Sequence, residues 1–104
     1  MTEAEQLLRA RLNAETGRLA WTELERHFAR GVVIKVAGDL DLVDVALAMA
    51  RDDKAVVADW LDRGRLAKAE PDDARAWHQQ QSEFWAVVAA PWVLIQEVAA
   101  RQDA

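Results

Sequence analysis

Three aspartates that follow a short apolar run are the residues best suited to chemistry in this chain of 104 residues. Asp39, Asp41 and Asp44 come after residues 32–37, whose β-branched composition predicts a buried central strand. Ligands often bind beyond the carboxyl ends of such strands, where carboxylates can hold a divalent cation or move protons. The pattern predicts a candidate ligand or metal pocket at Asp39, Asp41 and Asp44.

The same aspartates also fit a structural role. Asp41 precedes an apolar helical run that it can cap, and Asp44 suits the first turn of that helix. Residues 39–43 resemble the nucleophile motif of haloacid-dehalogenase-type phosphotransferases, but the match covers five residues in a chain too short for that fold. EF-hand spacing is not met, because Val43 stands where an oxygen ligand is needed. We interpret the three first as turn and capping residues.

The other reactive side chains form no catalytic set. His27 and His78 have no nucleophile at a fitting spacing, and Ser82, the single serine, lacks a G-x-S-x-G context. The absence of cysteine excludes disulfides, thiolate zinc sites and cysteine nucleophiles. Since no glycine-rich phosphate loop occurs either, we expect no cofactor and favour a protein that is not an enzyme.

Five tryptophans are more than a core of this size needs. Large aromatic side chains are enriched at protein interfaces as well as in cores. Trp85 and Trp92 flank Pro91 in the most apolar segment of the chain. We therefore predict an interaction surface at Trp85, Pro91 and Trp92, which binds a protein partner or a second copy of the chain.

Nucleic acid is a disfavoured partner because the net charge is −5. Two helices predicted over 42–51 and 54–63, with a tight break between them, resemble excisionase-like and MerR-like DNA-binding domains over residues 42–66. The outer face of the second helix would carry Asp59 and Asp62, which repel phosphates. Helix-turn-helix binding stays an alternative hypothesis.

The termini and the apolar segments indicate a cytoplasmic protein. The first residues include Glu3 and Glu5, which a signal peptide does not have before its apolar run. The longest apolar stretch, residues 84–95, is too short to cross a bilayer and contains Pro91. The absence of cysteine is consistent with a reducing compartment. We expect no membrane association.

Apolar spacing and capping residues outline the elements. Helices are predicted over 3–15, 23–30, 42–51, 54–63 and 71–80, with Thr22 and Glu25 as a capping box for the second. Strands are predicted over 32–37, 65–69 at an edge, and 84–89. Residues 92–96 fit another strand after a bend at Pro91, which we prefer, or a helix that begins at Pro91.

These elements predict an α+β fold, with a small mixed sheet of three or four short strands packed against four or five helices. The chain is long enough for one domain over 1–104. Within it we assign 1–20 to the N-terminal helix and its connection, 21–97 to the core, and 98–104 to a C-terminal tail.

The motifs together resemble the uncharacterised bacterial family catalogued as domain of unknown function 2288. The resemblance covers roughly residues 10–97 and is most distinctive in its last segment. It rests on LNAET (12–16), Trp21 with Glu23 and Leu24, DLDLV (39–43), DDK (52–54), Trp60 with Gly64, Trp77, and WAVVAAPWVLIQ (85–96). The resemblance implies a bacterial source and a stand-alone domain, and it carries no activity to transfer. Our leading hypothesis is a non-catalytic interaction or regulatory module that binds a protein partner or self-associates.

Overall fold

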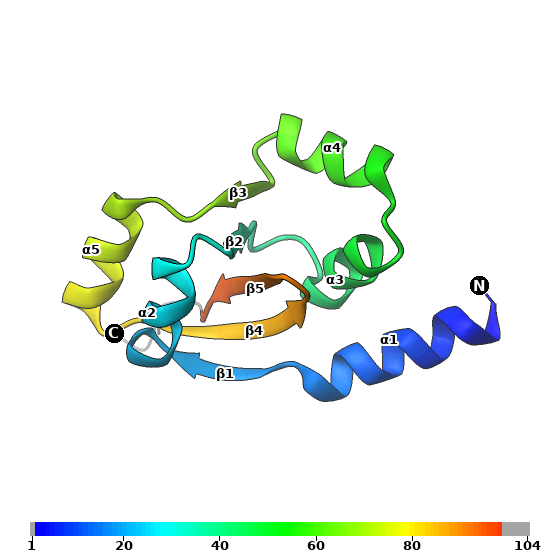
Figure 1. The fold of residues 1–104 in the computed structure, drawn as a ribbon, viewed down its shortest axis with the longest axis horizontal. Helices are drawn as coiled ribbons and strands as arrows, with labels where there is room; N and C mark the ends of the chain where they lie inside the picture. The colour runs from blue at the N-terminus through cyan, green and yellow to red at the C-terminus, as the bar shows by residue number, and fades with distance from the viewer. Residues whose placement is uncertain (1, 99–104) are drawn as a thin grey trace.

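A computed structural model describes residues 2–98, which form five helices and a five-stranded mixed sheet (Figure 1). The elements follow in the order α1 (Glu3–Glu15), β1 (Gly17–Ala20), α2 (Trp21–Ala29), β2 (Val33–Val36), α3 (Leu42–Ala50), α4 (Lys54–Asp62), β3 (Leu66–Lys68), α5 (Pro71–Gln80), β4 (Glu83–Ala89) and β5 (Trp92–Glu97). The expected α+β class and mixed sheet are confirmed. Most of the expected tail, residues 99–104, lies outside the described residues.

The sheet has the strand order β1-β4-β5-β2-β3. β4 and β5 form an antiparallel hairpin, with Val87 opposite Leu94. β5 also pairs in parallel with β2, which brings Val33 beside Val93. β1 and β3 add antiparallel edges to β4 and β2. The strand interpretation of residues 92–96 is therefore confirmed, and the alternative helix that begins at Pro91 is wrong.

Two local expectations are wrong near the N-terminal third of the chain. The sheet has a fifth strand, β1, in a segment where Gly17 indicated only a break. β1 has no β-branched residue, and its pairing with β4 holds it extended. α2 begins at Trp21 instead of residue 23, and its start is stabilised by the Ala20 N–H, which donates to Glu23 Oε1 at 3.1 Å. The expected capping box of Thr22 and Glu25 does not form.

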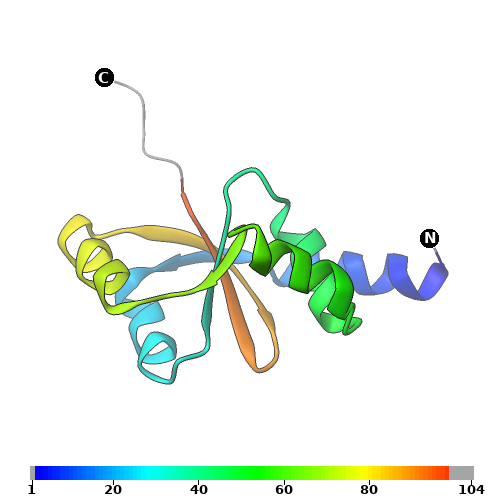
Figure 2. The ribbon, with the colours of Figure 1, turned by 90° about the horizontal axis from the view of Figure 1, so that it is seen from above.

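Helices pack on both faces of the sheet, each against one hydrophobic cluster (Figures 1 and 2). We call one side the α3 face, where α1, α3 and α4 pack on Ile34, Val87 and Leu94. The other side is the α2 face, where α2 and α5 pack on Phe84 and Ile95. Alternate residues of one strand therefore enter different clusters, as the two-residue period of a strand requires.

Neither face is covered along its whole length. In β4, Trp85 shares the α3 face with Val87, yet 42% of its surface is exposed. Val88 shares the α2 face with Phe84 and is 55% exposed. The helices of the two faces cover opposite ends of the sheet, with α2 and α5 at one end and α1, α3 and α4 at the other (Figure 1). Each face thus keeps one open end.

Candidate functional site

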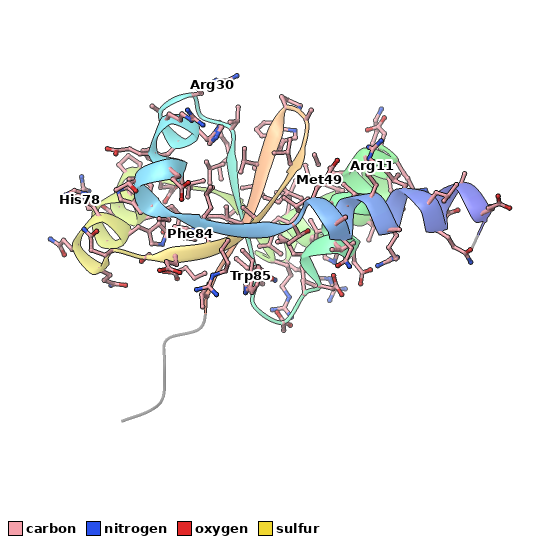
Figure 3. The ribbon with its side chains drawn as sticks, turned by 90° about the horizontal axis from the view of Figure 1, so that it is seen from below. Arg11, Arg30, Met49, His78, Phe84 and Trp85 are labelled. Carbon is pink, nitrogen blue, oxygen red and sulfur yellow. The ribbon has the colours of Figure 1, made fainter. Side chains whose placement is uncertain are left out.

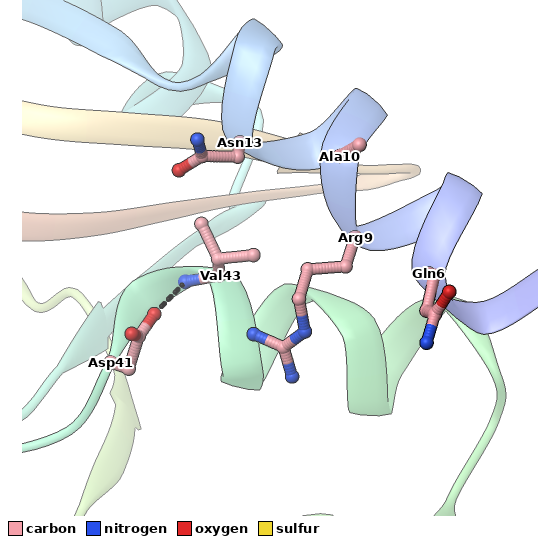
Figure 4. Close-up of a pocket in the computed structure, with 6 residues that line it drawn as sticks. All are labelled: Gln6, Arg9, Ala10, Asn13, Asp41 and Val43. Atoms are coloured by element: carbon pink, nitrogen blue, oxygen red, sulfur yellow. Dashed lines mark hydrogen bonds between the residues drawn. The ribbon is translucent and has the colours of Figure 1, made fainter. Parts of the chain in front are cut away.

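Asp41 caps α3 as the sequence predicts. Its Oδ1 accepts hydrogen bonds from the N–H groups of Val43 at 2.8 Å and Asp44 at 3.2 Å (Figure 4). These groups have no partner within the helix, so the cap stabilises the start of α3. α3 itself is mostly buried, in agreement with its apolar sequence. One oxygen of Asp41 therefore has a structural role.

Asp39 and Asp44 form separate ion pairs. Asp39 pairs with Arg65, and Asp44 pairs with Arg9 Nη1 at 2.6 Å. All of these side chains are at least one third exposed. No group of three or more His, Asp or Glu side chains within residues 2–98 could hold a metal ion. The three aspartates thus share one loop and helix start, but each has its own partner.

Gln96 holds this loop in place, and sequence reasoning missed it. Its Nε2 donates to the carbonyl oxygens of Ala37 at 2.8 Å and Leu40 at 2.6 Å. The side chain lies on the α3 face of β5, where it follows Trp92 and Leu94. A polar residue on the inner face of an apolar strand was the available signal, because such a residue needs hydrogen-bond partners.

A groove of about 280 Å³ lies between α1 and α3 (Figure 4). Its lining includes Gln6, Arg9, Asn13 and Asp41. The three α1 residues are three or four positions apart, which places them on one face of the helix. The groove therefore adds amide and guanidinium groups beside one of the predicted aspartates. Sequence reasoning missed these α1 residues, which carry no motif.

The predicted interaction surface is divided between two places. Trp85 lies on the open end of the α3 face, where the Arg18 guanidinium is 5.2 Å from the centre of its ring. Arg18 also pairs with Glu83 at 2.5 Å, so the exposed indole belongs to a small charged cluster. Pro91 and Trp92 lie instead at the hairpin turn, several residues along the sheet.

A second groove, which we call the Trp92 groove, lies in front of the hairpin turn and has a volume of about 340 Å³. Met49 and Val57 line it opposite Pro91 and Trp92. The break between α3 and α4 forms its rim, with Asp52, Asp53 and Lys54. The groove is therefore apolar inside and charged at the edge. The sequence predicted its hairpin side and missed its helical side.

The other tryptophans serve mainly in the core. Trp21 and Trp77 are 4% exposed, and their ring centres are 5.8 Å apart. Phe84 completes this aromatic cluster, with its ring centre 5.0 Å from Trp77. Trp60 is partly buried against the cluster on the α3 face. Among the described residues, Trp85 is the most exposed tryptophan, at 42%.

α3 and α4 adopt the predicted helix–break–helix arrangement. Asp53 caps α4, and Asp52 has a left-handed φ of 56° at the break. α4 has no buried residue, and its Leu61 is 51% exposed. Asp59 on its surface pairs with Arg63 at 3.0 Å. Nucleic-acid binding through this pair stays a prediction that the acidic surface of α4 disfavours.

Asp73, at the start of α5, has a pKa below its ordinary value of 3.8. Burial raises this pKa, but two contacts that favour the carboxylate outweigh it. The Glu70 N–H donates to Asp73 Oδ2 at 2.8 Å, and Lys35 Nζ lies 2.9 Å from the same oxygen. Asp73 therefore caps α5 and connects it to β2.

Comparisons with known proteins place the chain in one family. No curated protein matches it, and no helix in residues 2–98 has the length and apolarity needed to cross a membrane. The solution structure of PA1075 from Pseudomonas aeruginosa is similar, with 45% identity and a TM-score of 0.80 over 100% of this chain and 96% of that one. The model of the family described as "Protein of unknown function (DUF2288)" matches residues 7–97. The chain therefore belongs to the DUF2288 family.

Proposed function

We propose that this protein is a non-catalytic interaction module that binds an apolar side chain of a protein partner in the Trp92 groove. The observation that carries the proposal is the groove itself, whose walls come from α3, α4 and the hairpin turn. Its volume of about 340 Å³ is in the usual range for ligand pockets, which start near 300 Å³. Met49, Val57 and Trp92 supply the apolar contacts on which interface cores depend.

The chemistry of the lining supports binding over catalysis. The groove contains no histidine, serine or cysteine. Its two carboxylates are already engaged, because Asp53 Oδ1 accepts from the Val56 N–H and Asp52 pairs with Lys54. A charged rim around an apolar floor is the usual anatomy of a protein interface. The partner is a second copy of the chain or another protein.

We also propose that residues 1–104 act as one cytoplasmic domain. Leu12 of α1 is 2% exposed and lies in the cluster on the α3 face, which supports a single unit that includes the N-terminal helix. The absence of cysteine supports a reducing compartment.

Site-specific photo-crosslinking tests the role of the Trp92 groove. A photoreactive amino acid replaces Val57 in the groove, and a control protein carries it at Gln79, which is exposed on α5. After irradiation in cells we expect a discrete adduct from position 57 that is absent from position 79. Light scattering across a concentration range then shows whether the partner is a second copy. Equal labelling at both positions, or none, would contradict the proposal.

A second candidate function is the binding of a small polar ligand in the groove between α1 and α3. The observation that favours it is the convergence of Arg9, Asn13 and Asp41 on one groove. Titration with small carboxylates and amides, followed by amide NMR shifts, tests this function. Saturable shifts at Asn13 and Asp41 that are lost in Asn13→Ala are expected, and unchanged spectra would refute ligand binding.

A further inference from the structure

We propose that a second groove, on the α2 face, docks an acidic segment of a partner protein that also carries an apolar side chain. This groove, which we call the α2 groove, is separate from the Trp92 groove. The proposal rests on the interaction role above but on different residues, so the two can fail independently. Three observations support it: an open apolar floor, a group of exposed cations on α2 and near the turn that follows it, and backbone contacts between this turn and the groove.

The floor of the α2 groove is the open end of the sheet. The groove has a volume of about 240 Å³ and is lined by Leu19, Ala86, Val88 and Val93, with His27 on its α2 side. Val88 is the most exposed of these apolar residues at 55%. α2 and α5 pack at the other end of this face (Figure 1), and Val88 is exposed. An apolar side chain of a partner can occupy this place.

Three cations on α2 or near the turn that follows it differ from the other lysines and arginines in residues 2–98. Nine lysines and arginines of this part form ion pairs with carboxylates. The other three have no carboxylate of residues 2–98 within 4.0 Å, and these are Arg26, Arg30 and Lys68. All three are exposed. Within the described part of this acidic chain, the cations without an ion pair are thus these three.

Backbone contacts connect these cations with the α2 groove. Gly31, which follows Arg30, has a left-handed φ of 74°, and Lys68 Nζ lies 3.8 Å from where a Cβ on Gly31 would be. The next residue, Val32, donates its N–H to His27 O at 3.3 Å and accepts from the Val93 N–H at 2.8 Å. His27 and Val93 line the groove. The turn after α2 therefore joins the groove to Arg30 and Lys68.

Arg26 and Arg30 are one helical turn apart, so they lie on the same side of α2. Figure 3 shows Arg30 at the end of α2, directed away from the body of the molecule and on the opposite side of the view from Trp85. Two of the carboxylates near α2 or the groove have other roles, whereas Glu25, which directly precedes Arg26, is exposed to solvent. Glu23 accepts from the Ala20 N–H, and Glu15, which also lines the groove, lies opposite Arg11 at 3.9 Å.

Charge complementarity selects an acidic partner, and the apolar floor selects a protein over a nucleic acid. Three cations beside an apolar groove match a peptide segment with Asp or Glu near a Leu- or Phe-type anchor. A nucleic acid would require a broader positive surface, and it would meet the acidic remainder of this chain.

Peptide selection tests the proposal without knowledge of the natural partner. Short random peptides displayed on phage are selected against the full chain. We expect the enriched peptides to combine acidic residues with a large apolar residue. The triple variant R26E/R30E/K68E should bind these peptides at least about tenfold more weakly than the wild type does. Val88→Ser should also lower the affinity for them.

The matched control is R51E/R63E/R75E. It changes the net charge by the same amount, and each of its arginines is exposed and already ion-paired. This control should keep the affinity within about twofold. Circular dichroism and thermal unfolding of each variant confirm that the fold is intact before affinities are compared.

Several outcomes would overturn the proposal. One is that the enriched peptides contain no acidic residues, and another is that no peptide is enriched. A third is that both triple variants lose the same amount of affinity. If Val57→Glu abolishes peptide binding but R26E/R30E/K68E does not, the peptides bind in the Trp92 groove and the α2 groove is rejected as their site. A further outcome is that no peptide is selected but a DNA or RNA oligonucleotide binds in a salt-sensitive way. If R26E/R30E/K68E abolishes that binding, the cations bind a nucleic acid instead.

Discussion

Asp73 joins two elements through one carboxylate. Its Oδ2 accepts from the Glu70 N–H at the start of α5 and lies 2.9 Å from Lys35 Nζ on β2. Because these contacts hold its pKa below the ordinary value, the folded state binds a proton at Asp73 less readily than the unfolded chain does. The carboxylate therefore stabilises the fold above the unfolded pKa, and that contribution disappears as the pH falls through the folded pKa.

Asp73→Ala should lower the free energy of unfolding by about 1 kcal/mol at neutral pH, because a helix cap and an ion pair are lost. The difference from the wild type should shrink as the pH falls below about 4. Urea unfolding across the acidic range measures both effects. Asp72→Ala is the control, since Asp72 is 88% exposed and pairs only with Arg75. If the difference in unfolding free energy between Asp73→Ala and the wild type stays constant with pH, the charge of Asp73 does not contribute to stability.

Gln96 supplies two hydrogen bonds to the loop before α3. Gln96→Leu keeps the approximate size of the side chain but leaves the Ala37 and Leu40 carbonyls without their donor. We expect a loss of about 2 kcal/mol in unfolding free energy and faster amide exchange in the loop before α3. Gln79→Leu, on the exposed side of α5, is the matched control and should change stability little. Unchanged exchange in Gln96→Leu would contradict the anchoring role.

At the scale of elements, the start of α3 shows how a turn can imitate a ligand site. Asp41 follows a strand, as catalytic carboxylates often do, yet its Oδ1 caps the helix. Asp41→Ala should cost about 1 kcal/mol of unfolding free energy, while Asp41→Ser, which retains a capping oxygen, should cost less. Asp39→Ala should change stability by less than about 0.5 kcal/mol, because its pair with Arg65 is exposed. Equal costs for Asp39→Ala and Asp41→Ala would argue against the capping interpretation.

Elements with strong local signals were predictable, and those made by pairing were not. α3 combines a capping aspartate with an apolar run, and its bounds agree with the prediction to one residue. β5 has the β-branched and aromatic composition of a strand. β1 has neither a capping residue nor a β-branched composition. Its four residues form a strand because they pair with β4. The side chains that line the grooves were partly missed for the same reason, because Met49 meets Trp92 only after the chain has folded.

At the scale of the whole molecule, two hydrophobic clusters share one sheet but lie on opposite faces. Leu47 on α3 belongs to one cluster and is 5% exposed, while Ile95 belongs to the other and is 1% exposed. Leu47→Ala should cost about 2–5 kcal/mol and Ile95→Val about 0.5–1.5 kcal/mol.

The two costs should add to within about 0.5 kcal/mol in the double variant, because the side chains share no packing partner across the sheet. Denaturant unfolding of the wild type, the two single variants and the double variant measures this. The comparison requires that the slope of unfolding free energy against denaturant concentration is the same in all four proteins. A coupling energy well above that range would show that strain crosses the sheet, which the separate clusters do not predict.

The position of β5 has a consequence for how the chain folds during its synthesis. β5 is the last described strand in sequence, yet it lies between β4 and β2 at the centre of the sheet. Its parallel partner β2 leaves the ribosome roughly 60 residues earlier, as the pairing of Val33 with Val93 shows. Until β5 emerges, no strand pairing joins β2 and β3 to β4 and β1, and both apolar clusters remain incomplete. The sheet can therefore close only after residues 92–97 have been synthesised, and we expect a product that stops before Trp92 to be recognised by chaperones and proteases as unfolded.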